Sequence, residues 1–278
     1  MDNTKKSKFS KKTILITGAS TGIGKSTAEY FQNKGWNVAA SMRNPQKNDL
    51  KESKSLKKYK IDVTNKKQIN DAVKKVIKDF GRVDVLLNNA GYGAFGPVEC
   101  ATDEQIRRQF DVNVFGLIDM TKVVLPYMRK NKSGVIINIS SVAGQVTMPL
   151  GSLYHGTKFC VEGISEAMNY ELNPLGIKVK LVEPGGVKTD FAGRSMVMFD
   201  NKIRDYDPIV NKMMKLMHKN DVWPSLPLDV AKVIYKAATI KSKKIRFPVG
   251  SDAKLMLTVK RLFGPNAVNW LIKKMFKI

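Results

Sequence analysis

The stretch "TGASTGIG", residues 17–24, follows the apolar run "KTILIT" at 12–17 and opens a helical pattern at 23–34. Gly18, Gly22 and Gly24 remove Cβ atoms where the chain turns, which leaves room for a ligand's phosphates to approach the backbone. Free N–H groups at the start of the helix would face that ligand. A glycine turn between a strand and a helix predicts a nucleotide site; the alternative is a tight turn whose glycines serve packing.

Short β-branched runs alternate with longer helical patterns along the rest of the chain. We expect strands at 12–17, 36–41, 58–63, 82–91, 134–140, 176–185 and 243–249, and helices at 23–34, 66–80, 111–131 and 153–173. Runs that are apolar on both faces and are joined by helices predict an α/β fold: a doubly wound, Rossmann-like parallel sheet of about seven strands with helices on both faces. Such sheets bind ligands at the carboxyl ends of their strands.

The 278 residues divide by composition into a basic tail at 1–11, a single domain at 12–250 and a basic extension at 251–278. Within the domain, we expect a substrate lid at about 187–226. Asn65 and Gln68 have the spacing of a capping box at the start of the helix 66–80.

Composition favours a cytoplasmic protein. Hydrophobic residues make up 43% of the chain, yet no stretch approaches the roughly 18–20 apolar residues of a spanning helix, and the N-terminus lacks a secretory core. Cys100 and Cys160 form no disulfide framework, and no cluster has metal-ligand spacing, so we expect no metal.

The charge is strongly positive, with 48 Lys and Arg against 24 Asp and Glu, a formal +24. Residues 241–278 hold ten of these cations and one acid. Such a surface attracts anionic lipid, nucleic acid or an acidic partner, or it is simply a set of solvated lysines. Aromatic residues do not interleave with the lysines, so nucleic acid is disfavoured as a partner.

The C-terminal "NAVNWLIKKMFKI" predicts a basic amphipathic helix. Its apolar stripe has helical spacing and consists of Val268, Leu271, Ile272, Met275 and Phe276. A helix of this kind makes peripheral contact with an anionic membrane surface, or it packs on the body or on a second subunit.

Several separate motifs follow the glycine turn in order. They are "IDV" at 61–63, "NNAG" at 88–91, Asn113, Ser141 thirteen residues before Tyr154, Lys158, and "PGGVKT" at 184–189. Together with "TGASTGIG" they resemble the short-chain dehydrogenase/reductase family, in its compact single-domain branch. The resemblance covers roughly residues 11–190.

The resemblance implies an oxidoreductase with a nicotinamide cofactor. The family's cofactor positions fall on Gly18, Gly22, Ile23, Gly24, Asp62, Val63, Asn89, Ala90, Gly91, Tyr154, Lys158, Pro184, Gly185, Val187 and Thr189. Three of these motifs have simpler alternatives: Asn89 stabilises a turn, Asp62 precedes a helix, and Asn113 is a polar position on an amphipathic helix.

The end of the second strand predicts the cofactor. It reads "AASMRNP", with no acid before Asp49 to bind a ribose 2′-hydroxyl. Arg43 stands where a guanidinium would pair with a 2′-phosphate, and Ser20 and Ser41 would add hydroxyl contacts. We therefore expect NADP(H) to be preferred over NAD(H), unless Arg43 is only a solvated loop residue.

Tyr154 and Lys158 are one helical turn apart and share a face. The ammonium is expected to lower the pKa of the phenol, normally near ~10, toward a value useful in acid–base catalysis. By resemblance, Ser141 hydrogen-bonds the substrate oxygen, Lys158 also holds the nicotinamide ribose, and Asn113 positions a relay water. His155 points elsewhere on the helix and is given no role.

The region 191–224 is rich in adaptable apolar side chains: Phe191, Met196, Met198, Phe199, Met213, Met214, Met217 and Trp223. It predicts a hydrophobic ketone, aldehyde or alcohol of steroid, retinoid or lipid-like type, unless these residues only pack the lid onto the body. By analogy the helices 111–131 and 153–173 pair subunits into a homodimer or homotetramer. The rival readings are a catalytically idle NADP(H)-binding redox sensor and a membrane-surface binding protein.

Overall fold

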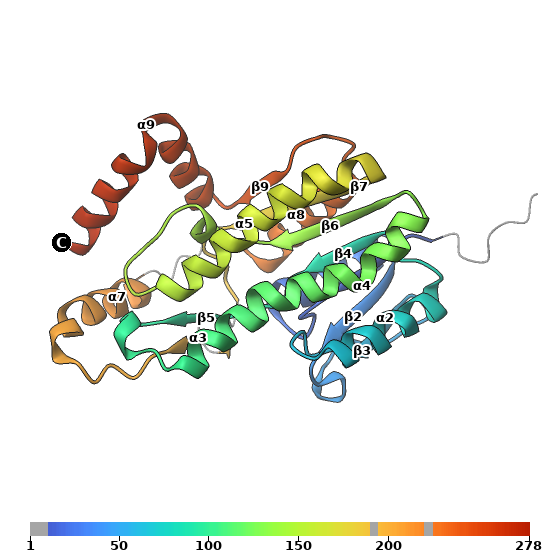
Figure 1. Cartoon of the computed structure of the whole chain (residues 1–278), viewed down its shortest axis with the longest axis horizontal. Coiled ribbons are helices and arrows are strands. Elements are labelled where there is room, and N and C mark those ends of the chain that lie inside the picture. The colour runs from blue at the N-terminus through green and yellow to red at the C-terminus, as the bar shows by residue number, and fades with distance from the viewer. Residues whose placement is uncertain (1–10, 190–193, 220–224) are drawn as a thin grey trace, which may run out of the picture.

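A seven-stranded parallel sheet forms the centre of the computed structural model, which describes residues 11–189, 194–219 and 225–278 (Figure 1). The strand order is β3-β2-β1-β4-β6-β7-β9. The strands are β1 Thr13–Ile16, β2 Asn37–Met42, β3 Leu56–Lys60, β4 Val85–Asn88, β6 Gly134–Ile139, β7 Ile177–Pro184 and β9 Arg246–Val249. The predicted α/β fold is thereby confirmed.

Helices cover both faces of the sheet, as its apolar strands require (Figure 1). Helices α1 Gly22–Asn33 and α8 Pro227–Thr239 pack on one face, and α2 Lys66–Phe80, α4 Gly116–Lys130 and α5 Ser152–Leu172 lie on the other. In β1, Ile14, Leu15 and Ile16 are fully buried between these layers. The sheet's carboxyl edge therefore remains the place for a site.

The predicted helix 111–131 is part of a longer helical run. It begins with α3 Asp103–Phe110, where Thr102 and Gln105 form a reciprocal capping box, and continues through a π-helical turn at Asp111–Phe115 into α4. The sequence interpretation missed this capping box. The π turn contains Asn113, and such turns are frequent at functional sites.

The expected capping box of α2 is half formed. The Asn65 side chain accepts a hydrogen bond from the Gln68 N–H at 3.0 Å. The Gln68 Oε1 atom, however, accepts from the Asp62 N–H at 2.9 Å rather than from Asn65. Gln68 thus links the loop that follows β3 to helix α2.

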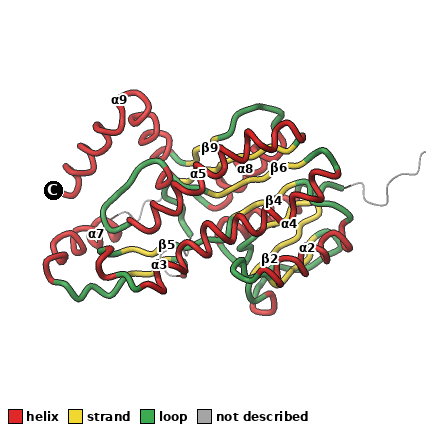
Figure 2. Tube along the Cα trace, in the orientation of Figure 1, coloured by secondary structure: helices red, strands yellow, loops and turns green. Residues whose placement is uncertain are grey.

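A second, smaller layer lies beside the main sheet (Figure 2). Strand β8 Met196–Met198 pairs in parallel with β5 Gly93–Phe95, a pair that the sequence patterns did not predict. Helix α7 Asp207–Lys219 contacts α9 Ser251–Phe276, which bends at Gly264 with φ of 75°. No helix among the described residues is long and apolar enough to span a membrane.

The predicted stripe of α9 divides into two groups. Val268, Ile272 and Phe276 are buried against α7 and the segment 142–150. Leu271 and Met275 are 38% and 39% exposed, so the five residues of the predicted stripe do not all pack on the body. The body meets only a narrow strip of the helix surface.

Candidate active site

The glycine turn is built as tightly as its sequence requires. Gly18 and Gly22 have left-handed φ angles of 67° and 54°. A Cβ atom on Gly18 would lie 2.9 Å from the Ala90 Cα, and one on Gly24 would overlap the Gly18 carbonyl oxygen. The turn therefore presents its backbone next to the end of β4.

Asn89 holds this turn from the neighbouring strand. Its Nδ2 donates to the carbonyl oxygens of Thr17 and Gly18 at 2.9 and 3.0 Å. The Thr17 hydroxyl accepts from the N–H groups of Asn89 and Ala90. The Asn89 side chain thus positions the cofactor turn, and a cofactor contact from Asn89 or Ala90 stays a prediction.

The Pro-Gly segment closes over the same turn. A Cβ atom on Gly22 would lie 3.4 Å from the Thr189 Cγ2. The Gly185 N–H donates to the Val249 carbonyl, and the Gly186 N–H donates to Asp252 Oδ2 at 2.6 Å. Asp252 is in the first turn of α9, so the C-terminal helix helps to hold this segment.

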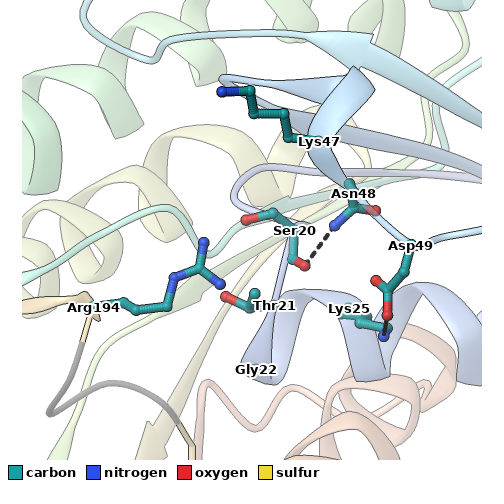
Figure 3. Close-up of a pocket in the computed structure, with 8 residues that line it drawn as sticks. All are labelled: Ser20, Thr21, Gly22, Lys25, Lys47, Asn48, Asp49 and Arg194. Carbon is teal, nitrogen blue, oxygen red and sulfur yellow. Dashed lines mark hydrogen bonds and ion pairs between the residues drawn. The ribbon is translucent and has the colours of Figure 1, made fainter.

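A cleft of about 690 Å³ lies beside the glycine turn (Figure 3). Its lining residues are Ser20, Thr21, Gly22, Lys25, Lys47, Asn48, Asp49 and Arg194. Lys25 pairs with Asp49 at 2.6 Å, and the Asn48 amide donates to the Ser20 carbonyl at 2.7 Å. The cleft has three cations and one carboxylate, and therefore suits an anion.

The sequence interpretation missed Lys47, Asn48 and Arg194 in this cleft. Lys47 ends the short 3-10 helix Pro45–Lys47, four residues after Arg43, and Arg194 comes from beyond the Pro-Gly segment. Lys47 could have been predicted from the sequence, because it is a second cation shortly after the second strand. Nothing in the local sequence places Arg194 there, because only the fold brings it to α1.

The two polar residues at the end of β2 differ from the prediction and from each other. Ser41 is 1% exposed and its hydroxyl donates to the Ile16 carbonyl at 2.9 Å, so the predicted hydroxyl contact from Ser41 is wrong. Arg43 is exposed and, among the described residues, has no ion-pair or hydrogen-bond partner. The Ser41 hydroxyl is thus used within the sheet, whereas the Arg43 side chain is exposed just beyond the end of β2.

Asp62 and Val63 follow β3. Asp62 Oδ1 accepts from the backbone N–H and the hydroxyl of Thr64 at 3.0 and 2.8 Å, as a turn residue does. Val63 is buried and packs so closely on α4 that a Cβ atom on Gly116 would lie 2.8 Å from its Cγ2. Both positions are near the expected adenine end, and their contact with a cofactor stays a prediction.

Ser141 and Tyr154 meet at the carboxyl end of β6. Ser141 caps the 3-10 helix Val142–Gly144, donates to the Pro184 carbonyl at 3.2 Å and is joined to the Tyr154 phenol by a hydrogen bond. Ser140, the neighbouring candidate, is buried, and its hydroxyl has no partner among the described residues. The thirteen-residue spacing therefore identified the serine that contacts the tyrosine.

Lys158 lies one turn below Tyr154, as predicted, but its effect on the phenol differs from the expectation. Its Nζ donates to the Ile139 carbonyl at 2.8 Å and lies 5.7 Å from the centre of the Tyr154 ring. Burial raises the pKa of Tyr154 to about 12 and lowers the pKa of Lys158 to about 8. Desolvation of both groups outweighs their attraction.

Asn113 is locked by the neighbouring loop. Its Oδ1 accepts from the Tyr92 N–H at 3.0 Å, and its Nδ2 donates to the Tyr92 carbonyl at 2.8 Å and to the Thr157 hydroxyl at 3.1 Å. Thr157 directly precedes Lys158. The π turn thus connects the loop after β4 to helix α5.

A buried acid cluster lies behind Lys158, and the sequence interpretation missed it. Glu183 of β7 is 1% exposed, is held by the Gln145 amide and lies beside Glu162 of α5. Arg246 of β9 reaches Glu162 at 2.9 Å, Glu166 at 3.3 Å and Glu183 at 3.9 Å. Burial and the neighbouring Glu162 raise the pKa of Glu183 to about 7.

His155, for which no catalytic role is expected, has a structural role. Its ring accepts from the Met148 N–H at 3.0 Å and bonds the Ala143 carbonyl at 2.9 Å through Nδ1. Burial lowers its pKa, so the ring is neutral at pH 7. His155 ties the segment after Ser141 to α5.

Apolar side chains surround the phenol. The rings of Tyr154 and Phe95 have centroids 5.3 Å apart, and Ala94, Leu153 and Phe199 form a buried cluster next to them. Of the predicted lid residues, Met213 is buried and Met196, Met198 and Met214 are partly exposed. Phe191 and Trp223, and the side chain of Met217, lie outside the described residues.

In the described part of the chain, no three His, Cys, Asp or Glu side chains gather where a metal ion would fit. Glycine turn, anion-binding cleft, Ser–Tyr–Lys set and Pro-Gly segment instead share one edge of the sheet. That arrangement fits an extended dinucleotide with its reactive end at Tyr154.

Known proteins have the same organisation. A family model described as short chain dehydrogenase matches residues 12–197. The 3-ketodihydrosphingosine reductase of Bacteroides thetaiotaomicron is 37% identical over 254 residues, which are 91% of this chain and 93% of that protein.

Solved structures agree. A short-chain dehydrogenase from Streptomyces avermitilis has a TM-score of 0.81 at 31% identity, covering 96% of this chain and 97% of its own. ElxO with NADP bound has a TM-score of 0.73 at 29% identity, covering 88% and 99%. This chain belongs to the short-chain dehydrogenase/reductase family of oxidoreductases.

Proposed function

We propose that this protein is an NADP(H)-dependent oxidoreductase that interconverts an apolar carbonyl compound and its alcohol. One observation carries the proposal: the Ser141 hydroxyl is hydrogen-bonded to the Tyr154 phenol, with Lys158 one helical turn away. This is the set that the family's chemistry requires. It lies among apolar side chains at the edge of the sheet where a dinucleotide would end.

A bound nicotinamide supplies or receives the hydride at the carbon of the substrate. In reduction, the Tyr154 hydroxyl donates its proton to the carbonyl oxygen, and in oxidation the phenolate takes the proton back. The Ser141 hydroxyl hydrogen-bonds the same oxygen and stabilises its developing charge. Lys158 would hold the ribose hydroxyls of the cofactor next to the phenol.

The preference for NADP(H) is supported by the charge around the glycine turn. No carboxylate follows β2 before Asp49, and Asp49 is paired with Lys25. Arg43 is exposed at the end of β2, and Lys47 and Arg194 line the neighbouring cleft. A 2′-phosphate gains from such cations through charge-assisted hydrogen bonds.

The apolar substrate is supported by Phe95, which packs on Tyr154, and by the buried cluster of Ala94, Leu153 and Phe199. The name of the similar reductase from Bacteroides thetaiotaomicron denotes a ketone carried on a sphingoid lipid. A long-chain lipid ketone is therefore the first substrate class to test.

The test is a panel of lipid ketones, steroids, retinal and simple aldehydes, following consumption of NADPH and NADH. Tyr154→Phe removes the acid and base, and Tyr170→Phe, an exposed position on the same helix, is the matched control. Turnover with NADPH that is lost only in Tyr154→Phe supports the proposal. Tight NADPH binding with no turnover of any substrate would favour the idle redox sensor instead.

Assembly into a homodimer or homotetramer through α4 and α5 is a further part of the proposal. It is supported by exposed aromatic side chains next to and on these helices: Phe115 is 55%, Phe159 43% and Tyr170 70% exposed. Light scattering of the protein and of Phe115→Glu tests it, since the charge would disperse such an assembly.

A further inference from the structure

The C-terminal helix carries an unusual concentration of exposed apolar side chains. Among the described residues, sixteen large apolar side chains are exposed, and seven of them belong to α9 and the terminal residue after it. We call six of them the α9 outer face: Leu255, Leu262, Phe263, Trp270, Leu271 and Met275; the seventh, Ile278, lines a cleft with Met148 and Phe159. Isolated exposed apolar side chains are normal, but a concentration of this kind marks an interaction surface.

The side of α9 opposite the outer face packs against the body. Val268, Ile272 and Phe276 are buried against Val146, Leu150 and Met213. The outer face therefore contributes nothing to that core. Leu262 and Phe263, 68% and 70% exposed, directly precede the bend at Gly264.

The bend of α9 stands away from the body (Figure 1). Leu262 and Phe263, which are among the most exposed apolar residues of the helix, thus lie next to this bend. A protruding pair of Leu and Phe is suited to insertion into an apolar medium and poorly suited to a flat protein contact.

Cations surround the apolar residues of this helix. Lys254, Arg261, Lys273, Lys274 and Lys277 are exposed, and none of the described carboxylates forms an ion pair with them. The one acid of α9, Asp252, accepts from the Gly186 N–H. Lys274 Nζ lies 5.1 Å from the centre of the Trp270 ring.

We propose that the α9 outer face binds the surface of an anionic lipid bilayer. Leu262, Phe263 and Trp270 would enter the headgroup boundary, and the neighbouring lysines would contact the headgroups. A second copy of the chain is a poor occupant, because it would bring the same cations into opposition. The lipid surface complements both the charge and the apolar side chains.

The docking helix also contacts the active-site segments. Lys260 donates to the Gln145 carbonyl, four residues after Ser141, and Asp252 holds the Gly186 N–H. Docking would therefore hold the segment 142–150 and α7 near the bilayer, one helix behind its surface. That position suits an apolar substrate, but the docking itself does not depend on the proposed reaction.

The experiment is sedimentation of the full chain with vesicles of phosphatidylcholine alone or with about 30% phosphatidylglycerol, without substrate or cofactor. We expect binding only to the anionic vesicles, with loss at high salt. Leu262→Glu/Phe263→Glu should weaken it about tenfold or more. Lys273→Glu/Lys274→Glu/Lys277→Glu should weaken it about a hundredfold.

Matched controls separate the α9 outer face from general charge. Leu175→Glu places a charge at an exposed apolar residue after α5, and Lys51→Glu/Lys54→Glu/Lys74→Glu makes the same charge change on exposed lysines elsewhere. Both should bind like the unaltered protein. Circular dichroism melts verify that every variant is folded.

Trp270 provides a direct probe of insertion. Lipids with brominated acyl chains should quench the fluorescence of the unaltered protein, and Trp270→Phe should remove that quenching. No sedimentation with anionic vesicles at low salt would overturn the proposal, and so would equal losses in the α9 variants and their controls. Dimers that Leu262→Glu/Phe263→Glu disperses, without vesicle binding, would assign the face to a second copy. None of these outcomes bears on turnover, so the two proposals fail separately.

Discussion

The nucleotide half of the molecule and its C-terminal layer use apolar side chains in opposite ways. In β1, Ile14, Leu15 and Ile16 are fully buried, and the glycines of the following turn bring the backbone of neighbouring strands almost into contact. In α9, by contrast, Ala253, Val268, Ile272 and Phe276 are buried, and six large apolar side chains of the same helix are exposed. The first region is specified by close packing, and the second keeps surface available for a partner.

The largest effect expected in the nucleotide half is on catalysis. Tyr154→Phe keeps the ring that packs on Phe95 but removes the proton donor. The rate of the chemical step should fall by about 10²–10⁴-fold, with nucleotide affinity nearly unchanged. Single-turnover kinetics and fluorescence titration with NADPH measure the two quantities. Equal losses of rate and affinity would contradict an acid–base role.

Gly24→Ala tests whether the glycine turn is too closely packed to accept a methyl group. The added methyl group would overlap the Gly18 carbonyl oxygen and approach the Asn89 amide at 2.7 Å. Such overpacking costs about 1–3 kcal/mol of unfolding free energy, and it displaces the turn that should cradle the cofactor. Gly163→Ala is the control, since an added Cβ there has no neighbour within 4 Å, and it should be neutral or stabilising. Chemical denaturation and NADPH titration of both variants test this contrast.

The two sides of α9 are compared by Ile272→Ala and Leu271→Ala. Ile272 is 8% and Leu271 is 38% exposed, although they are adjacent. The first change should cost about 2–4 kcal/mol and the second less than about 0.5 kcal/mol. Limited proteolysis near the C-terminus and thermal melts measure the difference. Similar losses of unfolding free energy in the two variants would mean that Leu271 is packed as closely as Ile272.

The last comparison is the pH dependence of Glu183→Gln. The folded protein holds the Glu183 proton with a pKa of about 7, raised from 4.5, so this group contributes stability at low pH that is lost as the pH rises through 7. The amide that replaces the carboxyl group in this variant has no charge to bury. The variant should therefore melt higher than the unaltered protein at about pH 8, with a smaller difference at about pH 5. The exposed Glu171→Gln should show no such trend.

Motif spacing predicted well which residues meet at the carboxyl end of β6, for a physical reason. Ser141, Tyr154 and Lys158 sit on one strand end and one helix, so a residue count places them. The Ser41 hydroxyl is occupied by the Ile16 carbonyl of β1, a contact between strands that the sequence alone does not report. Arg194 and Glu183 depend on contacts between segments far apart in the chain, and no local pattern reports them.

By itself the sequence determined the alternation of strands and helices, the glycine turn and the Tyr–Lys pair, because each depends on the backbone periodicity of a short segment. Only the tertiary structure decided which charges meet and which side chains lose water. Burial raised the pKa of Tyr154 where a lysine neighbour had predicted a lower one. It also divided the stripe of α9 into buried and exposed sides, because burial depends on what the rest of the chain places against each residue.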